Sequence, residues 1–243
     1  MFDFEELDFQ STPLGDISLR RRAEPRLGGE IVYEVKLGDE FLMSSLFPEA
    51  EIQLARLGLE ALVESGMDTE LDVVVGGLGL GYTAAAVLEV PAVASLTVID
   101  VMAPVIDWHR RGLVPLGATL CDDARCTLLQ GDFFALAASD AAGFGAGDAV
   151  APVHAVLLDI DHSPRHWLHP DNRGFYSIGG LQALANKLHA GGVFGLWSNE
   201  PPDNDFIALL GEVFVDCRSH VVRFANPYTG GRSSNTVYLA HRA

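Results

Sequence analysis

Lysine is scarce in this sequence, where only Lys36 and Lys187 occur. Lysine and arginine together number 16 against 33 acidic residues, which gives a formal net charge of −17. A surface of this charge repels the phosphates of nucleic acids and anionic lipid headgroups, so we expect neither nucleic acid nor membrane as a partner. The same charge weakly favours a cationic substrate, although solubility alone also accounts for it.

Cysteine and long apolar runs are scarce as well. Cys121, Cys126 and Cys217 have no metal-ligand spacing, and we expect reduced thiols that fill the core. No apolar run approaches the ~20 residues of a membrane helix. The first residues are acidic, whereas a secretory leader begins with basic residues. These absences predict a soluble, cytoplasmic protein.

The first part of the chain differs in pattern from the rest. Residues 17–20 and 31–36 alternate apolar and polar positions around a Gly-Gly pair, which predicts a β-hairpin, and residues 40–44 predict a third short strand. After Pro48, apolar residues at helical spacing predict a helix that ends at Gly66. We therefore divide the chain into a small β segment, residues 1–47, and a main domain, residues 48–243.

From Leu71 onward, apolar β-rich runs alternate with helical segments. Runs without polar alternation indicate strands buried on both faces of a parallel sheet. The last two runs, 213–224 and 235–241, predict an antiparallel hairpin at one edge. The predicted fold class is α/β: a Rossmann-like sheet of the class I methyltransferase type, mostly parallel with an antiparallel C-terminal edge. Small residues over 137–149 predict a flexible loop.

A glycine-rich turn follows the first strand of the main domain. Gly76, Gly77, Gly79 and Gly81 remove β-carbons where the backbone must turn and where a ligand approaches its amides. Such a turn also occurs for packing alone. Asp100, at the tip of the next strand, favours the ligand because its carboxylate can accept both ribose hydroxyls. Together they predict an adenine nucleotide site.

Asp132 brings a second carboxylate to the same edge of the sheet. It can accept from the exocyclic amine of adenine, or it can cap the helix that starts at Phe133, and the sequence leaves both open. A Rossmann dehydrogenase is a competing interpretation. The third acid-tipped strand and the antiparallel edge favour a site for S-adenosylmethionine instead.

Asp159 follows a buried strand and Asp161 comes two residues later. On an extended chain the two carboxylates share a face, and a close pair of acids raises one pKa, which suits a base that deprotonates an ammonium. These are the candidate catalytic residues. The alternative for Asp161 is a cap within the following loop.

The loop over 162–174 is long and rich in proline, histidine and aromatic residues, which predicts a lid. Trp167 and Tyr176 then line a pocket or hold a cation, or they only pack. The histidines of this loop lack a compelling metal-ligand spacing, and sulfonium chemistry requires no metal, so we expect no metal site.

Taken together, the motifs resemble the spermidine synthase family of polyamine aminopropyltransferases. The resemblance rests on GDEF at 38–41, the glycine turn, the VID that ends at Asp100, Gly131-Asp132, LLDIDHSP and LHAGGVFGLWS. Two positions depart from the family. Leu80 stands where the family has an acid associated with the amine of the aminopropyl group. The two acids after the fourth strand are two residues apart, where the family has them three apart.

The resemblance implies a divergent transferase with an S-adenosylmethionine-type donor substrate, a small amine acceptor and a homodimeric state. It implies that the glycines hold the methionine-like portion of the donor, Asp100 the ribose and Asp132 the adenine, while Asp159, with Asp161, activates the amine. Three functions stay open. The first is aminopropyl transfer from decarboxylated S-adenosylmethionine, the second is methyl transfer from intact S-adenosylmethionine to a small molecule, and the third is nucleotide or partner binding without catalysis.

Overall fold

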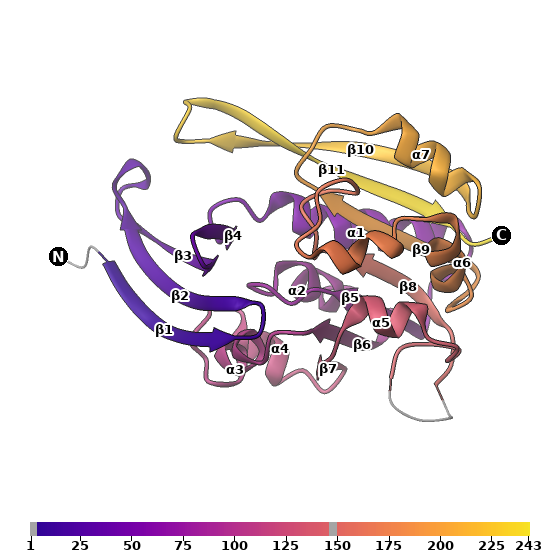
Figure 1. Ribbon diagram of the computed structural model, residues 1–243, viewed down its shortest axis with the longest axis horizontal. Coiled ribbons are helices and arrows are strands. Elements are labelled where there is room, and N and C mark those ends of the chain that lie inside the picture. The colour runs from indigo at the N-terminus through magenta and orange to yellow at the C-terminus, as the bar shows by residue number, and fades with distance from the viewer. Residues whose placement is uncertain (1–3, 146–149) are drawn as a thin grey trace.

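The protein folds into two β-sheets with helices packed around the larger one (Figure 1). The structure, a computed structural model, describes residues 4–145 and 150–243. Residues 146–149 of the predicted flexible loop lie outside the described residues. The described part of that loop is fixed at one point, because the buried Lys187 ammonium donates to the carbonyl oxygens of Ser139 and Ala141 at 2.9 and 2.7 Å.

The smaller sheet is antiparallel throughout and contains β1 (Phe4–Thr12), β2 (Gly15–Glu24), β3 (Glu30–Leu37) and β4 (Glu40–Ser44) in sequence order. The predicted hairpin and third strand are confirmed. The sequence did not predict β1, because FEELDFQST has few apolar residues and most of its positions are exposed or half-buried.

The larger sheet has seven strands in the order β10-β11-β9-β8-β5-β6-β7. The strands β5 to β9 pair in parallel, and β11 and β10 add an antiparallel edge, as the sequence predicts. In the described chain, no helix is both long and apolar enough to cross a membrane. The elements from α1 to β11 are α1 (Glu49–Glu64), β5 (Leu71–Gly76), α2 (Tyr82–Leu88), β6 (Val93–Asp100), α3 (Ala103–Arg110), α4 (Gly117–Cys121), β7 (Cys126–Gln130), α5 (Phe133–Ala138), β8 (Val153–Leu158), α6 (Ile178–Ala185), β9 (Leu188–Ser198), α7 (Asn204–Gly211), β10 (Val215–Asn226) and β11 (Gly231–His241).

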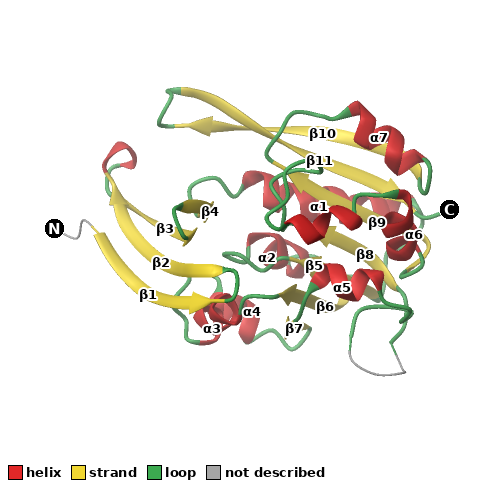
Figure 2. Cartoon of the chain, viewed as in Figure 1, coloured by secondary structure: helices red, strands yellow, loops and turns green. Residues whose placement is uncertain are grey.

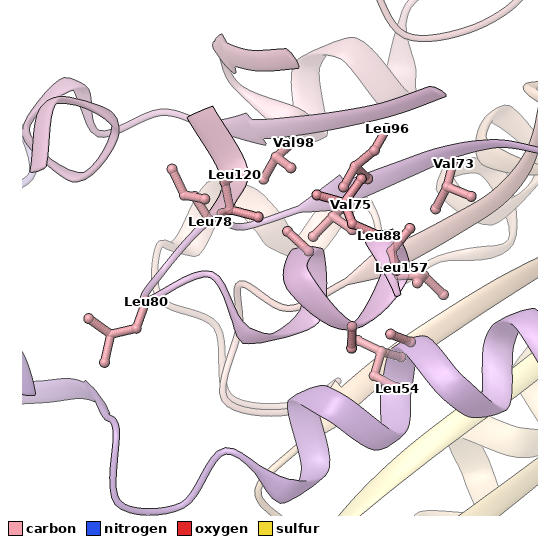
Figure 3. Close-up of a cluster of buried hydrophobic side chains, with 14 of the residues drawn as sticks. Leu54, Val73, Val75, Leu78, Leu80, Leu88, Leu96, Val98, Leu120 and Leu157 are labelled. Carbon is pink, nitrogen blue, oxygen red and sulfur yellow. The ribbon is translucent and has the colours of Figure 1, made fainter. Parts of the chain in front are cut away.

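Helices pack against the larger sheet (Figure 2), and a hydrophobic core lies on each face of the sheet. Successive residues of a strand point to opposite faces, so Val73 and Val75 of β5 join the core under α1 and α2, while Val74 joins the core under α5 to α7. Figure 3 shows part of the first core around Val73 and Val75. Each aliphatic side chain buried in this way contributes roughly 1.5–3 kcal/mol, which explains the unbroken apolar runs.

The smaller sheet shares a core with the main body. Ile17, Leu19 and Val35 are fully buried in the same cluster as the strand β5 side chains. The two sheets also meet at a second point, where the hydroxyl of Tyr228, in the turn between β10 and β11, accepts from Arg22 of β2 at 2.6 Å. The chain passes from β4 to α1 between residues 44 and 49, and the division at residue 47 stays a prediction.

Cys126 and Cys217 pack against the hydrophobic cores, as expected, whereas Cys121 differs from that expectation. All three are free, but Cys121 is exposed, and Cys126 and Cys217 are half-buried. The physical reason is position: Cys121 ends the short helix α4, and the other two lie on β7 and β10, the two edge strands, which have a neighbour on one side only.

Candidate active site

The glycine turn between β5 and α2 lies directly against the end of β8. Gly77 has a φ of +96°, and a β-carbon there would lie 2.1 Å from the carbonyl oxygen of Asp159. The amide of Asp159 donates to the carbonyl oxygen of Gly76 at 2.7 Å. Only glycine permits both this backbone conformation and this close approach, so the turn and the end of β8 form one unit.

Asp100 ties the glycine turn to the end of β6. Its carboxylate accepts from the amide of Leu78 at 3.0 Å and from the amide of Met102 at 2.8 Å. Burial raises the pKa of Asp100, and these backbone hydrogen bonds oppose the shift. A carboxylate has about four acceptor positions, and the amides of Leu78, Gly79 and Met102 do not fill all of them, so Asp100 can still accept from a hydroxyl group of a ligand.

One cavity of about 510 Å³ joins most of the residues that the sequence singled out. This volume falls within the usual range of small-molecule sites. Strands β5, β6 and β8 contribute through their carboxyl ends, where ligands bind in open α/β sheets. The predicted residues that line the cavity are Gly77, Gly79, Gly81, Asp100, Asp132 and Asp159.

Gly76 and Asp161 are not among the described residues that line this cavity. Gly76 ends β5, where a β-carbon would come within 2.7 Å of the ring of Phe133. The glycine therefore allows α5 to pack closely against the sheet, which is the packing role that such turns also serve.

Asp132 combines the two roles that the sequence left open. One carboxylate oxygen accepts from the amides of Phe134 and Ala135 at 2.9 and 3.2 Å, which makes Asp132 the N-cap of α5. Asp132 also lines the cavity. Capping occupies only Oδ1, so Oδ2 is left as an acceptor toward a ligand.

Asp159 has few partners for a carboxylate in so enclosed a position. Among the described residues, its side chain has one hydrogen bond, in which the hydroxyl of Thr83 donates to Oδ2 at 3.1 Å. Burial raises the pKa of Asp159 to about 6, and the Thr83 hydrogen bond opposes that shift. A carboxylate of this kind is a stronger base than an exposed aspartate while still being ionised near pH 7.

Glu51 of α1 is a site residue that the sequence reasoning missed. It lines the same cavity, and its Oε2 is buried without a hydrogen-bond partner in the described structure. Burial raises the pKa of Glu51 to about 8, and the negative charge of Asp159 adds to the shift. The acid that faces Asp159 is therefore Glu51.

A signal for Glu51 was present in the helical pattern. Leu54, Ala55 and Gly58, which are three, four and seven positions further along α1, are all buried. Glu51 thus belongs to the apolar face of the helix, and an acid on such a face indicates a functional site.

Asp161 occupies a different environment from Asp159. Its side chain is buried and accepts three hydrogen bonds, from the amide of Leu168 at 2.7 Å, from Asn172 at 2.8 Å and from the hydroxyl of Tyr176 at 2.9 Å. These donors all belong to the segment that follows β8. The geometry matches the loop-cap alternative, and the catalytic role of Asp161 stays a prediction.

The predicted lid segment, residues 162–174, includes the short helix η2 (Pro170–Gly174) and borders the cavity through His162, Leu168 and Asn172. His162 connects this segment to the smaller sheet, with Nε2 at 2.9 Å from Oε1 of Glu40. In the part of the chain that the structure describes, no group of three or more histidine, cysteine or acidic residues is arranged to hold a metal ion.

Neither Trp167 nor Tyr176 is among the described residues that line the cavity; the two residues pack within the segment, and the guanidinium of Arg173 lies 5.9 Å from the centroid of the Trp167 ring. The indole nitrogen of Trp167 donates to the carbonyl oxygen of Pro164 at 2.9 Å, and the Tyr176 hydroxyl is taken by Asp161. The two rings stack with their centroids 6.5 Å apart. The aromatic residues that line the cavity within the described chain are Tyr82, Phe133, Phe134 and Trp197.

No protein-family model matches the sequence, and no curated protein sequence matches it significantly.

Solved structures do match in three dimensions. Spermidine synthase from Thermotoga maritima aligns with 98% of this chain and 72% of its own, with a TM-score of 0.69 and 15% identity. A spermidine synthase in complex with the transition-state analogue AdoDATO gives the same coverage, a TM-score of 0.69 and 15% identity. A probable spermidine synthase from Corynebacterium glutamicum aligns with 98% of this chain and 79% of its own, with a TM-score of 0.63 and 14% identity. The chain therefore has the fold of spermidine synthases, as its motifs predicted.

Proposed function

We propose that the protein is a spermidine-synthase-like transferase that moves an aminopropyl group from decarboxylated S-adenosylmethionine to an amine. One observation carries this proposal: a single cavity brings the glycine turn and the nucleotide-type acids Asp100 and Asp132 together with the partner-poor Asp159. The fold shared with a spermidine synthase solved with a transition-state analogue supports the choice of reaction class.

The donor nucleoside occupies the part of the cavity around β6 and β7. Asp100 accepts from the ribose with the acceptor capacity that the amides of Leu78, Gly79 and Met102 leave open. The uncapped oxygen of Asp132 accepts from the adenine amine. The chain that carries the sulfonium then passes along the glycine turn toward Asp159.

The transfer is an in-line displacement at carbon. The lone pair of the acceptor nitrogen forms a bond to the propyl carbon attached to sulfur, while the carbon–sulfur bond breaks and its electron pair goes to sulfur. The positive sulfonium becomes a neutral thioether, and the new carbon–nitrogen bond leaves a proton on nitrogen. The enzyme contributes orientation, a dry cavity and a base.

Asp159 acts as that base. An alkylammonium has a pKa near 10 in water, so it must lose a proton before its lone pair can attack. The raised pKa of Asp159, about 6, brings the carboxylate closer to the amine in basicity than an ordinary aspartate. Asp161, two residues further on, holds the following loop in place and so supports the reaction without contacting the substrate.

Methyl transfer from intact S-adenosylmethionine is the second candidate. Leu80 lines the cavity with an apolar side chain at the position where an acid would repel the carboxylate of the intact donor. Calorimetric titration with each donor separates the two candidates: aminopropyl transfer predicts tighter binding of the decarboxylated donor. Binding of the intact donor alone would favour methyl transfer.

The variant Asp159→Asn tests the assigned base. We expect kcat to fall by roughly 10²–10⁴-fold because the proton acceptor is lost. Asp122→Asn is the matched control, since Asp122 is an exposed residue at the end of α4. Turnover retained in Asp159→Asn would reject Asp159 as the base.

A further inference from the structure

The cavity contains a buried carboxylate oxygen that no protein donor satisfies. Oε2 of Glu51 is shielded from solvent and has no hydrogen-bond partner in the described structure. An isolated polar atom of this kind costs free energy when it is buried. Proteins keep such atoms mainly where a ligand or a bound proton supplies what is missing.

No protein cation compensates Glu51. Among the described residues that line the cavity there is no arginine and no lysine. His162 is engaged by Glu40, and the ring of His169 accepts from the amide of Asp171 at 3.3 Å. Any compensating positive charge must therefore come from a ligand.

The neighbours of Glu51 add negative charge or neutral groups. Asp159 faces it from the end of β8, and Glu49 lies two positions earlier on α1 and is exposed. From α2, Tyr82 stays neutral because burial raises its pKa, and the hydroxyl of Thr83 is donated to Asp159.

Resting on the proposed function, we propose that Glu51 and Asp159 together form the binding site for a primary ammonium group of a substrate. An ammonium has three donors, enough for Oε2 of Glu51 and for an oxygen of Asp159 at the same time. The ammonium comes from the acceptor amine or from the aminopropyl chain of the donor, which have the same chemistry. Glu51 also supplies the cavity with an acid, whereas Leu80, which lines the same cavity, is apolar.

A proton replaces the ammonium when the site has no ligand. Burial and the charge of Asp159 raise the pKa of Glu51 above neutrality, so the pair carries a single negative charge at pH 7. Binding of an ammonium stabilises the ionised form of Glu51, and the proton leaves to solvent. The amine enters and remains as a cation, so the net exchange is about one proton released per ammonium bound.

Calorimetric titration at pH 7, in buffers with different heats of ionisation, counts this proton. One arm uses n-butylamine as the amine, and the other uses decarboxylated S-adenosylmethionine, so that the two sources of ammonium are distinguished. We expect release of about one proton in at least one arm. In Glu51→Gln we expect no release and an affinity at least roughly tenfold weaker in that arm. Glu60→Gln, which removes an exposed acid more than two turns further along the same helix, should behave as the wild type.

Carbon-13 NMR titration of the carboxyl groups, without any substrate, provides a second readout. We expect Glu51 to titrate above neutrality in the wild type and at lower pH in Asp159→Asn. Glu51 titrating in the usual range of glutamate, or proton release unchanged in Glu51→Gln, would overturn the two-carboxylate site. If aminopropyl transfer fails while Glu51 still titrates above neutrality, only the proposed function is overturned, because the NMR titration requires no donor.

Discussion

Two acids that are two residues apart in the sequence lie in opposite kinds of environment. Asp159 has one side-chain hydrogen bond, from Thr83, and faces the unpartnered Glu51 across the cavity. Asp161 accepts three hydrogen bonds and does not reach the cavity lining of the described chain. The contrast teaches that burial alone does not mark a reactive acid. A deficit of partners marks a group that awaits a ligand, whereas a full set of partners marks a group that holds structure.

Asp161→Ala should produce the largest change in stability. Three donors lose their acceptor inside the protein, so we expect a loss of about 3 kcal/mol in the free energy of unfolding. Urea denaturation at pH 7 measures it. The same measurement on Asp159→Asn should show no loss, because an ionised acid with raised pKa opposes folding. Equal losses in the two variants would remove the distinction between the acids.

Glu51→Gln should stabilise the protein, in a pH-dependent manner. The pKa of Glu51 is raised in the folded state to about 8, so the unfolded chain loses this proton first as pH rises from about 4.5. The contribution of Glu51 to the free energy of unfolding of the wild type therefore decreases as pH rises from about 4.5 to about 8. We expect the variant to be more stable by about 2 kcal/mol at pH 7 and equal to wild type near pH 4.

Urea denaturation at both pH values measures this difference, and Glu60→Gln serves as the control because Glu60 is exposed on the same helix, more than two turns from Glu51. A pH-independent difference for Glu51→Gln would show that the carboxyl of Glu51 ionises normally.

Glu40→Gln should have the smallest effect. The contact between Glu40 and His162 joins the smaller sheet to the segment after β8, but the Glu40 side chain is 55% exposed. Partly exposed pairs contribute less than about 1 kcal/mol and weaken with salt. Urea denaturation at low and high salt measures it. A loss as large as that of Asp161→Ala would mean that Glu40, and not Asp161, holds the segment.

The sequence predicts those parts of the site that follow from strand order. Asp100 ends β6, Asp159 directly follows β8 and Asp132 comes two residues after β7, and the carboxyl ends of parallel strands meet at one edge of the sheet. Their meeting in one cavity therefore requires only the α/β pattern. The antiparallel edge formed by β10 and β11 was predictable for a different reason: two apolar runs lie close together in the sequence.

The parts that the sequence did not predict depend on packing between distant segments. Glu51 reaches Asp159 only because α1 lies across the larger sheet, where it contacts β8 and β9. Asp161 shared a predicted face with Asp159 only for an extended chain, and the chain bends after β8.

The most direct test of the central claim is the mass of the product. The protein is incubated with decarboxylated or intact S-adenosylmethionine and a panel of amines, and the mass of the acceptor is measured by mass spectrometry. The account predicts a gain of one aminopropyl group from the decarboxylated donor, lost in Asp159→Asn. A gain of one methyl group from the intact donor, or no modified acceptor with either donor, would contradict it.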